Sequence, residues 1–193
     1  MKKVPSFFAT IIVIIAFALS SCRTGSKTKE PAGELNTDQL IKRGSYLVNA
    51  IGCDDCHSPK KLGTNGPQVD LETRLSGHPF NSILGNPDTS VFKTGWVLFS
   101  MDLTAFTGPW GTSYSANITP DITGIGSWTE EQFIYSIREG KYKGLKEGRS
   151  LLPPMPWQVY RNLDDTDLKA IFAFLKTIKP VSNVMPAPKA PGK

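Results

Sequence analysis

Five consecutive residues constrain this chain more than any other feature: Cys53-Asp54-Asp55-Cys56-His57. A Cys-x-x-Cys-His run is the attachment motif of a c-type heme. On a helical turn, two cysteines three positions apart can reach the two vinyl groups on one edge of a porphyrin. The histidine that follows lies under the ring with an imidazole nitrogen free for iron. The motif predicts one covalently bound heme c, with thioether bonds to Cys53 and Cys56 and His57 as the proximal iron ligand.

A Cys-x-x-Cys pair has two other interpretations, a thioredoxin-like redox site and half of a zinc site. A zinc site needs four ligands, and the chain offers only Cys22 and His78 besides the motif. A redox dithiol is expected near a strand–helix–strand pattern, which the sequence does not display. Both interpretations stay as alternatives to heme attachment.

The N-terminal residues resemble an export signal. A basic start is followed by the apolar stretch Phe7–Ala18, which is too short to span a bilayer. The stretch leads into Leu19–Cys22, which resembles a bacterial lipobox, a signal that is cleaved before its cysteine. We expect a signal peptide over 1–21 and a lipid on Cys22 that anchors the protein to a membrane. An ordinary cleaved signal with an unrelated cysteine is the alternative.

Cysteine use is consistent with export, whereas the net charge says little. All three cysteines are assigned, one to lipid and two to heme, so no disulfide is expected even in an oxidising compartment. The formal net charge of +5 includes two lysines of the predicted signal peptide. No basic stripe is interleaved with aromatic residues, so nucleic acid is not an expected partner. These features predict a periplasm-facing, lipid-anchored protein of the bacterial cell envelope.

Composition divides the chain into four parts. After the signal peptide, residues 22–36 are mostly polar and typical of a flexible tether. One domain is expected over 37–181, a length that suits a single core. The tail, residues 182–193, is rich in Pro, Ala and Lys and is expected to be disordered.

Three helices are predicted from apolar residues at helical spacing. They cover residues 37–51, 130–139 and 165–178. Each follows a residue that can cap a helix: Asn36, Thr129 and Asp164. Each is followed by a residue that ends or blocks a helix: Gly52, Gly140 and Pro180. Their expected buried faces are Leu40, Gly44, Leu47, Val48 and Ile51, then Phe133 and Ile137, then Leu168, Ile171, Phe172, Leu175 and Ile178.

Gly44 lies in the middle of the first predicted helix, where glycine costs about 1 kcal/mol relative to alanine. A close approach of the terminal helix, with Phe172 and Leu175 packing there, would explain it. A tolerated glycine without a packing role is the alternative.

The segment 59–128 contains many Gly, Pro, Asn, Ser and Thr residues, which predicts mostly ordered loops. A short strand is expected at 96–99, paired near 103–106. The segment either forms a docking surface for a redox partner or covers one side of the heme, and the sequence leaves both open.

Several segments resemble a known family. They are Asn117–Asp121, Thr123–Trp128, Pro153–Trp157, Leu163–Leu168 and Ala170–Leu175. With the order helix, heme motif, loops, helix, Met-bearing loop and terminal helix, the chain resembles class I c-type cytochromes. It is similar to bacterial periplasmic cytochromes c associated with membrane-bound dehydrogenases. The resemblance covers about residues 37–180. It implies a mainly α cytochrome c fold, with three or more helices around one heme and long ordered loops, and it allows a short β-hairpin.

Dehydrogenase subunits of that kind often carry several hemes, whereas this chain has one motif. The difference favours a stand-alone electron carrier over a whole dehydrogenase subunit. The expected partners are redox proteins: a dehydrogenase, other cytochromes or a terminal oxidase. The competing hypothesis is a heme enzyme or gas sensor, such as a peroxidase, which needs a releasable sixth iron ligand.

Four residues can supply that sixth ligand: Met155, Met101, Met185 and His78. Met155 is favoured, because prolines on both sides stiffen its loop and because class I cytochromes place the ligand just before the terminal helix. Met101 is expected in the core, His78 in a surface loop or behind a ligand, and Met185 in the tail. His/Met ligation would close the iron to substrates and favours a carrier rather than an enzyme.

The remaining site predictions concern the heme pocket. Trp157, Tyr160, Phe172 and Pro154 are expected to form its walls. Arg149 is expected to meet a heme propionate, because a guanidinium and a carboxylate match in geometry. A solvated surface arginine is the alternative.

Overall fold

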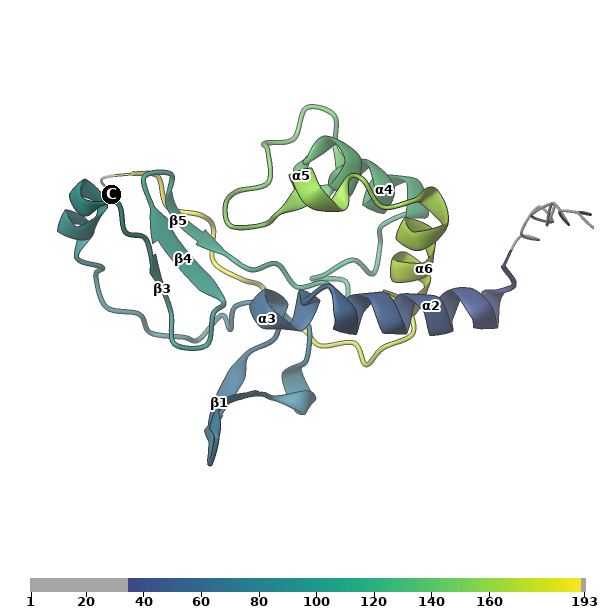
Figure 1. Ribbon diagram of the computed structural model, residues 1–193, viewed down its shortest axis with the longest axis horizontal. Helices are drawn as coiled ribbons and strands as arrows, with labels where there is room; N and C mark the ends of the chain where they lie inside the picture. Colours follow the sequence, from purple (N-terminus) through teal and green to yellow (C-terminus); the bar gives the residue numbers. More distant parts are fainter. Residues whose placement is uncertain (1–34, 192–193) are drawn as a thin grey trace, which may run out of the picture. The chain divides into compact units, whose positions relative to one another are not determined.

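The computed structural model describes residues 35–191, so the predicted signal peptide, Cys22 and most of the tether lie outside the described range. Three helices form what we call the helical part: α2 (Thr37–Ala50), α4 (Glu130–Glu139) and α6 (Asp165–Leu175) (Figure 1). The short helix α3 (Cys53–His57) carries the heme motif, and the short helix α5 (Trp157–Tyr160) follows the loop that contains Met155. Short 3₁₀ turns lie at 71–73, 89–94 and 142–144. Among residues 35–191, no helix combines the length and apolar character needed to cross a bilayer.

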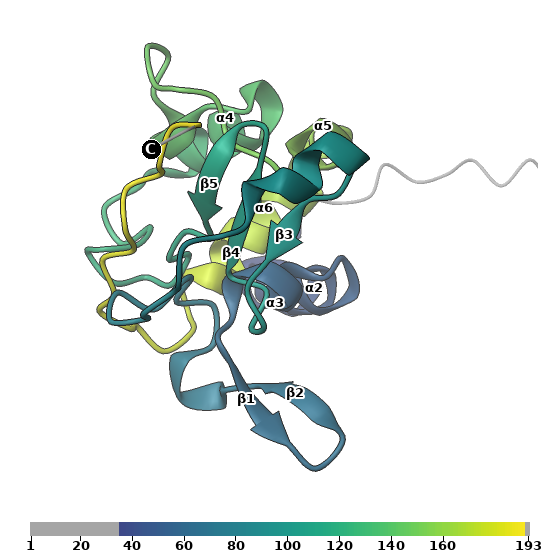
Figure 2. The ribbon, with the colours of Figure 1, turned by 90° about the vertical axis from the view of Figure 1, so that its left-hand side faces the viewer.

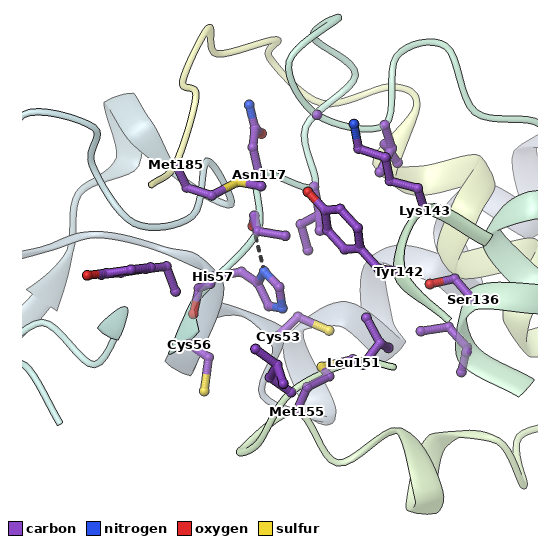
Figure 3. A pocket seen from close by; sticks show the side chains of 18 of the residues that line it. Cys53, Cys56, His57, Asn117, Ser136, Tyr142, Lys143, Leu151, Met155 and Met185 are labelled. Atoms are coloured by element: carbon purple, nitrogen blue, oxygen red, sulfur yellow. Dashed lines mark hydrogen bonds between the residues drawn. The ribbon is translucent and has the colours of Figure 1, made fainter. Parts of the chain in front are cut away.

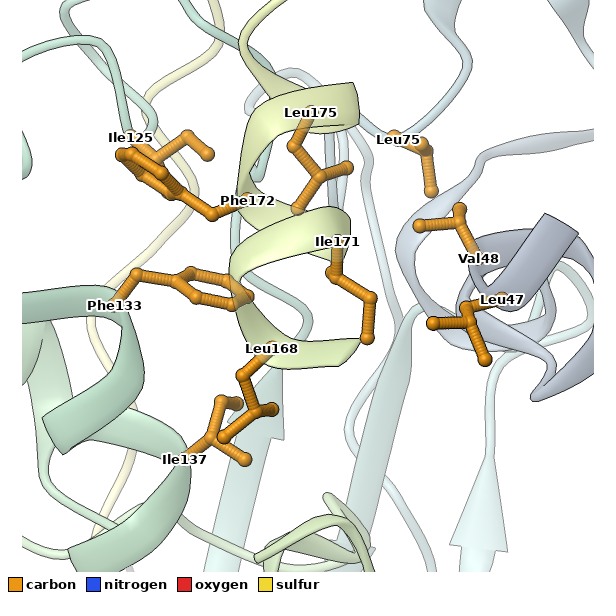
Figure 4. Packing of buried hydrophobic residues seen from close by; sticks show 10 residues of the cluster. All are labelled: Leu47, Val48, Leu75, Ile125, Phe133, Ile137, Leu168, Ile171, Phe172 and Leu175. Carbon is orange, nitrogen blue, oxygen red and sulfur yellow. The ribbon is translucent and has the colours of Figure 1, made fainter. Parts of the chain in front are cut away.

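The core lies where α6 packs between α2 and α4. Figure 4 shows Leu47 and Val48 of α2 on one side of α6, and Phe133 and Ile137 of α4 on the other. Gly44 is buried at the crossing of α2 and α6, and a Cβ there would overlap the carbonyl oxygen of Ala170. The close approach of the terminal helix expected at this glycine is confirmed, although the nearest atoms belong to Ala170 and Phe174 and not to Phe172 and Leu175.

The helix limits follow the predicted signals closely. Capping boxes start α2 at Asn36 and α4 at Thr129. The terminal helix ends at Leu175 rather than at residue 178, because its last turn tightens, with the Thr177 N–H donating to the carbonyl of Phe174. Asp164 occupies the N-cap position of α6, but its side chain makes no capping hydrogen bond.

Residues 58–128 form what we call the loop-and-strand part, with two antiparallel sheets (Figure 2). The first pairs β1 (Lys60–Gly63) with β2 (Gly66–Val69). The second has the order β3-β4-β5, with β3 (Leu98–Phe99), β4 (Ala105–Gly108) and β5 (Gly111–Tyr114). The expected pairing of a strand near 96–99 is confirmed, since Phe99 lies opposite Phe106. The β1-β2 hairpin and β5 were not predicted.

Polar contacts stabilise this second part. His78 is 1% exposed, and its Nδ1 lies 2.7 Å from the hydroxyl of Thr104, which donates to Asp102 over 2.7 Å. The expectation of a surface position for His78 was therefore wrong. The Thr104 hydroxyl bonds one ring nitrogen, and the Tyr114 ring packs against the imidazole with ring centres 4.9 Å apart.

The end of the chain differs from the predicted disordered tail. Residues 182–191 follow a defined path beside the loop-and-strand part, coloured yellow in Figure 1. Asn183 is buried, and Lys189 pairs with Thr112 of β5. Backbone and amide hydrogen bonds fix this segment, and composition does not reveal such bonds.

Candidate functional site

The heme motif forms a single helical turn, α3, directly after α2. Gly52 separates the two helices in a left-handed conformation, with φ of 77°, which glycine adopts at little cost. Cys53 and Cys56 are both free thiols and both line one cavity of about 830 Å³. The turn therefore places both cysteines at a single cavity, as heme attachment requires.

Asp54, the first of the two residues between the cysteines, fixes this turn. Asp54 accepts hydrogen bonds from Nε and Nη2 of Arg74 at 2.9 and 2.6 Å, and from the Ser58 hydroxyl at 2.6 Å. These bonds lower the pKa of Asp54, although burial alone would raise it. Asp54 therefore acts as a clamp between the motif and the loop that carries Arg74.

Lys60 holds the other end of the turn. Its ammonium donates to the carbonyl oxygens of Asp55 at 2.6 Å, Ser58 at 2.9 Å and Asp102 at 3.0 Å. A cation suits the C-terminal end of a helical turn, where carbonyl groups lack intrahelical partners. The turn is thus tied to the loop before β4 as well as to Arg74.

The protonation of the thiols bears on the redox-dithiol alternative. Burial raises the pKa of Cys53 to about 12, and burial also raises the pKa of Cys56. Redox-active Cys-x-x-Cys pairs have at least one thiol with a depressed pKa. Both thiols are protonated at neutral pH here, which disfavours thiol–disulfide exchange. The zinc alternative also lacks support, because residues 35–191 contain no cluster of three or more His, Cys, Asp or Glu that could hold a metal.

His57 has the arrangement of a metal ligand. Its Nδ1 lies 2.8 Å from the carbonyl oxygen of Ala116. A carbonyl only accepts hydrogen bonds, so Nδ1 carries the proton and Nε2 keeps its lone pair. Burial lowers the pKa of His57, which favours this neutral form. Figure 3 shows the bond as a dashed line and the second ring nitrogen on the side of Cys53 and Met155.

Met155 lines the same cavity from the loop before α5. Its backbone N–H closes a turn to the carbonyl of Leu152 over 3.2 Å, and prolines stand on both sides. The Tyr160 hydroxyl donates to the carbonyl of Ile51 over 2.8 Å, which ties α5 to the end of α2 beside the motif. This bond links the helix after the Met155 loop to the residues just before the heme motif.

Arg149 also lines the cavity. Its guanidinium lies 4.0 Å from the centre of the Tyr142 ring and donates to the Ser150 carbonyl. Burial lowers the pKa of Arg149, and among residues 35–191 no carboxylate forms an ion pair with it. A stacked cation of this kind at the cavity can accept an anionic group such as a carboxylate.

Not every predicted pocket residue is in the cavity. Pro154 and Tyr160 line it, whereas Trp157 and Phe172 do not. Trp157 instead lies against Gly140, and Phe172 stacks near Phe133 in the core with ring centres 5.4 Å apart.

The other candidate ligands are placed differently from one another. Met101 is 84% exposed, so its expected core position was wrong; the neighbouring Trp96 and Phe99 are exposed as well. His78 is bonded to Thr104 and does not line the cavity. Met185, the weakest candidate in the sequence, does line it.

Sequence reasoning missed several residues that complete the cavity. Ser136, Tyr142 and Lys143 line it from α4 and the turn that follows, and Phe106 and Tyr114 line it from β4 and β5. Asn117 also lines the cavity, and its place in a segment that resembles cytochromes c could have indicated this. The strand residues carried no signal, because their position depends on the path of the long loops.

The residues present fit a heme c. The cavity gathers two thiols three residues apart, an imidazole with a free nitrogen, a thioether and a cation at its border. Apolar side chains complete the lining, among them Ile118, Ile125, Leu168, Ile171 and Leu175. A porphyrin has two apolar faces and two carboxylates, and this donor set matches both features.

Comparison with known proteins gives a consistent picture. A family model described as Cytochrome c matches residues 41–179. The gluconate 2-dehydrogenase cytochrome c subunit of Pantoea cypripedii is 33% identical over 153 residues, 78% of this chain and 26% of the relative. The fructose dehydrogenase cytochrome subunit of Gluconobacter japonicus is 33% identical over 173 residues, 89% of this chain and 28% of the relative.

A third relative is the cytochrome c subunit of alcohol dehydrogenase (quinone) from Gluconobacter oxydans (strain 621H). It is 31% identical over 153 residues, which is 78% of this chain and 24% of the relative. The chain spans about a quarter of the length of these three curated relatives.

Proposed function

The chain belongs to the cytochrome c family, and from this premise we propose that it is a single-heme electron carrier of the bacterial cell envelope. Cys53 and Cys56 would hold one heme c through thioether bonds, and His57 and Met155 would ligate its iron. Heme c, when bound, supplies reversible one-electron chemistry. The single heme follows from the single attachment motif in the sequence.

One observation carries this proposal: the two motif cysteines, His57 and Met155 all line the same cavity. The Ala116 carbonyl orients His57 by accepting a hydrogen bond from its Nδ1–H, and such a bond also raises the basicity of the ligand. The prolines beside Met155 reduce the freedom of its loop, so little order is lost when the thioether binds.

Two protein ligands would leave no iron position for a substrate or a gas, which argues against the enzyme and sensor hypotheses. The chain then acts by holding the cofactor, excluding water with its apolar lining and presenting one edge to partners. Arg149, stacked on Tyr142, would receive one propionate of the cofactor.

The relatives suggest the electron donor. The three relatives are named as cytochrome subunits of gluconate, fructose and alcohol dehydrogenases. We propose that a membrane-associated dehydrogenase delivers electrons to this chain, and that another cytochrome or a terminal oxidase receives them. Docking would be transient, through a small interface that releases quickly.

The membrane attachment is proposed from the sequence alone. Cys22, the expected lipidation site, lies outside the described residues, and so does the signal peptide. A Cys22→Ser variant should leave the membrane fraction for the soluble periplasmic fraction, as detected by heme staining after fractionation. Retention in the membrane fraction would contradict a lipid anchor on Cys22.

The axial ligand can be tested with matched methionine variants of the holoprotein. We expect Met155→Ala to lose the thioether-to-ferric-iron charge-transfer band and to bind carbon monoxide readily when reduced. Met101→Ala is the control, because Met101 is exposed outside the cavity. A five-coordinate, high-spin wild-type protein would contradict the carrier function. Loss of the band in Met185→Ala, but not in Met155→Ala, would move the ligand to Met185.

A further inference from the structure

The chain after α6 returns across the molecule as what we call the C-terminal segment, residues 181–191. Figures 1 and 2 show it in yellow, passing from the end of α6 to the neighbourhood of β5. Its sequence is short of charge and rich in proline, and composition alone predicts disorder. Two anchors hold it in place.

The first anchor is Asn183, which is 6% exposed. Its Nδ2 donates to the carbonyl oxygens of Ser76 at 2.7 Å and His78 at 2.9 Å, and its Oδ1 accepts from the N–H of Phe80 at 3.0 Å. The Asn183 N–H donates to the Thr123 hydroxyl at 3.0 Å. All polar groups of this side chain are used in holding the segment to the loop-and-strand part.

Asn117 connects this anchor to the heme site. Its Nδ2 donates to the carbonyl oxygen of Val181 at 2.8 Å, and its neighbour Ala116 provides the carbonyl that orients His57. The start of the C-terminal segment therefore supports the loop that positions the proximal histidine.

The second anchor is Lys189, which pairs with Thr112 of β5 through backbone hydrogen bonds of 2.9 and 3.0 Å. Gly111 makes this approach possible. Its φ of 94° lies in the left-handed region, and a Cβ there would overlap the carbonyl oxygen of Lys189. The pairing extends the edge of β5 by one bridge.

The residues between the two anchors all line the cavity, and they are Val184, Met185, Pro186, Ala187 and Pro188. None of them is charged, and the two prolines restrict the backbone. The stretch therefore has the composition of a stiff apolar wall, in which Met185 and Pro186 are half-buried and Val184, Ala187 and Pro188 are exposed.

We propose that residues 184–188 form a wall of the heme cavity that keeps water from the cofactor, and that Asn183 and Lys189 position this wall. The inference rests on the proposed function, since it assigns the cavity to heme. Water near the iron stabilises the more highly charged ferric form, so exclusion of water raises the reduction potential. The C-terminal segment thus sets the potential without binding the iron.

The test uses the holoprotein and releases the outer anchor alone. Lys189→Pro removes the backbone N–H that donates to Thr112, whereas the control Lys189→Ala keeps it and removes only an exposed side chain. At a fixed redox poise we expect the ratio of ferrous to ferric protein to fall about tenfold in the proline variant, which equals about 59 mV for one electron. Lys189→Ala should match the wild type. Faster amide hydrogen exchange at Thr112, whose N–H donates to the Lys189 carbonyl, should accompany the effect.

A second variant tests the proposal if the C-terminal segment keeps its position despite Lys189→Pro. A chain that ends at Ser182 lacks the wall and both anchors, and its heme should show the same or a larger fall in potential. An unchanged reduction potential in that chain, with covalent heme and the charge-transfer band intact, would contradict the proposed role of residues 184–188. A wild-type protein without covalent heme would instead overturn the proposed function, so the two failures are distinct.

Discussion

The buried side chains of the helical part and of the loop-and-strand part differ in kind. Among residues 35–191, nine of the twelve buried apolar residues lie in α2, α4 and α6. Eight of the ten buried polar residues lie between 58 and 128, including His78, Thr104 and Asn117. Every fully buried side-chain nitrogen or oxygen in this range has a hydrogen-bond partner.

The difference separates two ways of enclosing a cofactor. The helices bury apolar faces that local periodicity already specifies, and this burial supplies most of the free energy of folding. The loops bury polar groups that become satisfied only through partners far away in sequence, such as Asn183 with Ser76. The heme motif lies at the border and takes support from both parts.

The largest expected effect comes from the apolar core. Leu168 of α6 is 1% exposed, so Leu168→Ala should lower the free energy of unfolding by about 3 kcal/mol, through lost burial and a residual cavity. Urea unfolding of the holoprotein measures it, with an unchanged slope as evidence for the same folded state. Thr166→Ala, at an exposed position of the same helix, is the matched control. Equal effects of the two substitutions would show that the buried face of α6 does not contribute to the stability of the core.

The crossing of α2 and α6 should be almost as sensitive. Gly44→Ala places a methyl group against the Ala170 carbonyl, and we expect a loss of about 2 kcal/mol. Alanine alone would favour the helix by about 1 kcal/mol, so the sign of the change tests the packing directly. Gly85→Ala is the control, since a Cβ there meets no atom within 4 Å. A stabilised Gly44→Ala variant would mean that the glycine is merely tolerated.

A polar residue at the border should have a smaller, pH-dependent effect. Asp54→Asn breaks the pairing with Arg74, which should cost about 1.5 kcal/mol at neutral pH. The pKa of Asp54 lies below its ordinary value of 3.8 in the folded protein. Its contribution is therefore present above that value and is lost as the pH falls through the folded pKa.

The measurement is the difference in urea midpoint between wild type and Asp54→Asn, followed from neutral pH downward. The difference should shrink below about pH 4. Asp55→Asn is the control, because the exposed Asp55 side chain forms no ion pair in the described part of the chain. If the difference in urea midpoint stays constant down to strongly acid pH, the ion pair with Arg74 is not its cause.

These contrasts also explain what the sequence could predict. The three main helices, the capping residues Asn36 and Thr129 and the Gly44 crossing depend on spacing over a few residues, and these were predictable. The motif residues and Met155 were identified as site candidates by local pattern and by resemblance. Their gathering around one cavity needed the structure.

The missed features depend on distant partners. Nothing near His78 indicates that Thr104 would satisfy it in the interior, and nothing near Met185 indicates that Asn183 would fix its segment beside the cavity. Trp157 was misplaced for a related reason. An aromatic residue next to the Met155 loop can pack on either side of it, and here Trp157 packs on Gly140.

The smallest expected effect tests whether the exposed apolar residues of the loop-and-strand part contribute to its stability. Trp96 is 71% exposed, so Trp96→Ser should change the free energy of unfolding by less than about 0.5 kcal/mol. The control is Ala105→Ser, which adds a hydroxyl at a position that is 3% exposed and should therefore cost more. If Trp96→Ser destabilises the protein more than Ala105→Ser, the exposed aromatic packs against the domain in solution. The loops would then rely on apolar burial as the helices do, and the contrast between the two parts would fail.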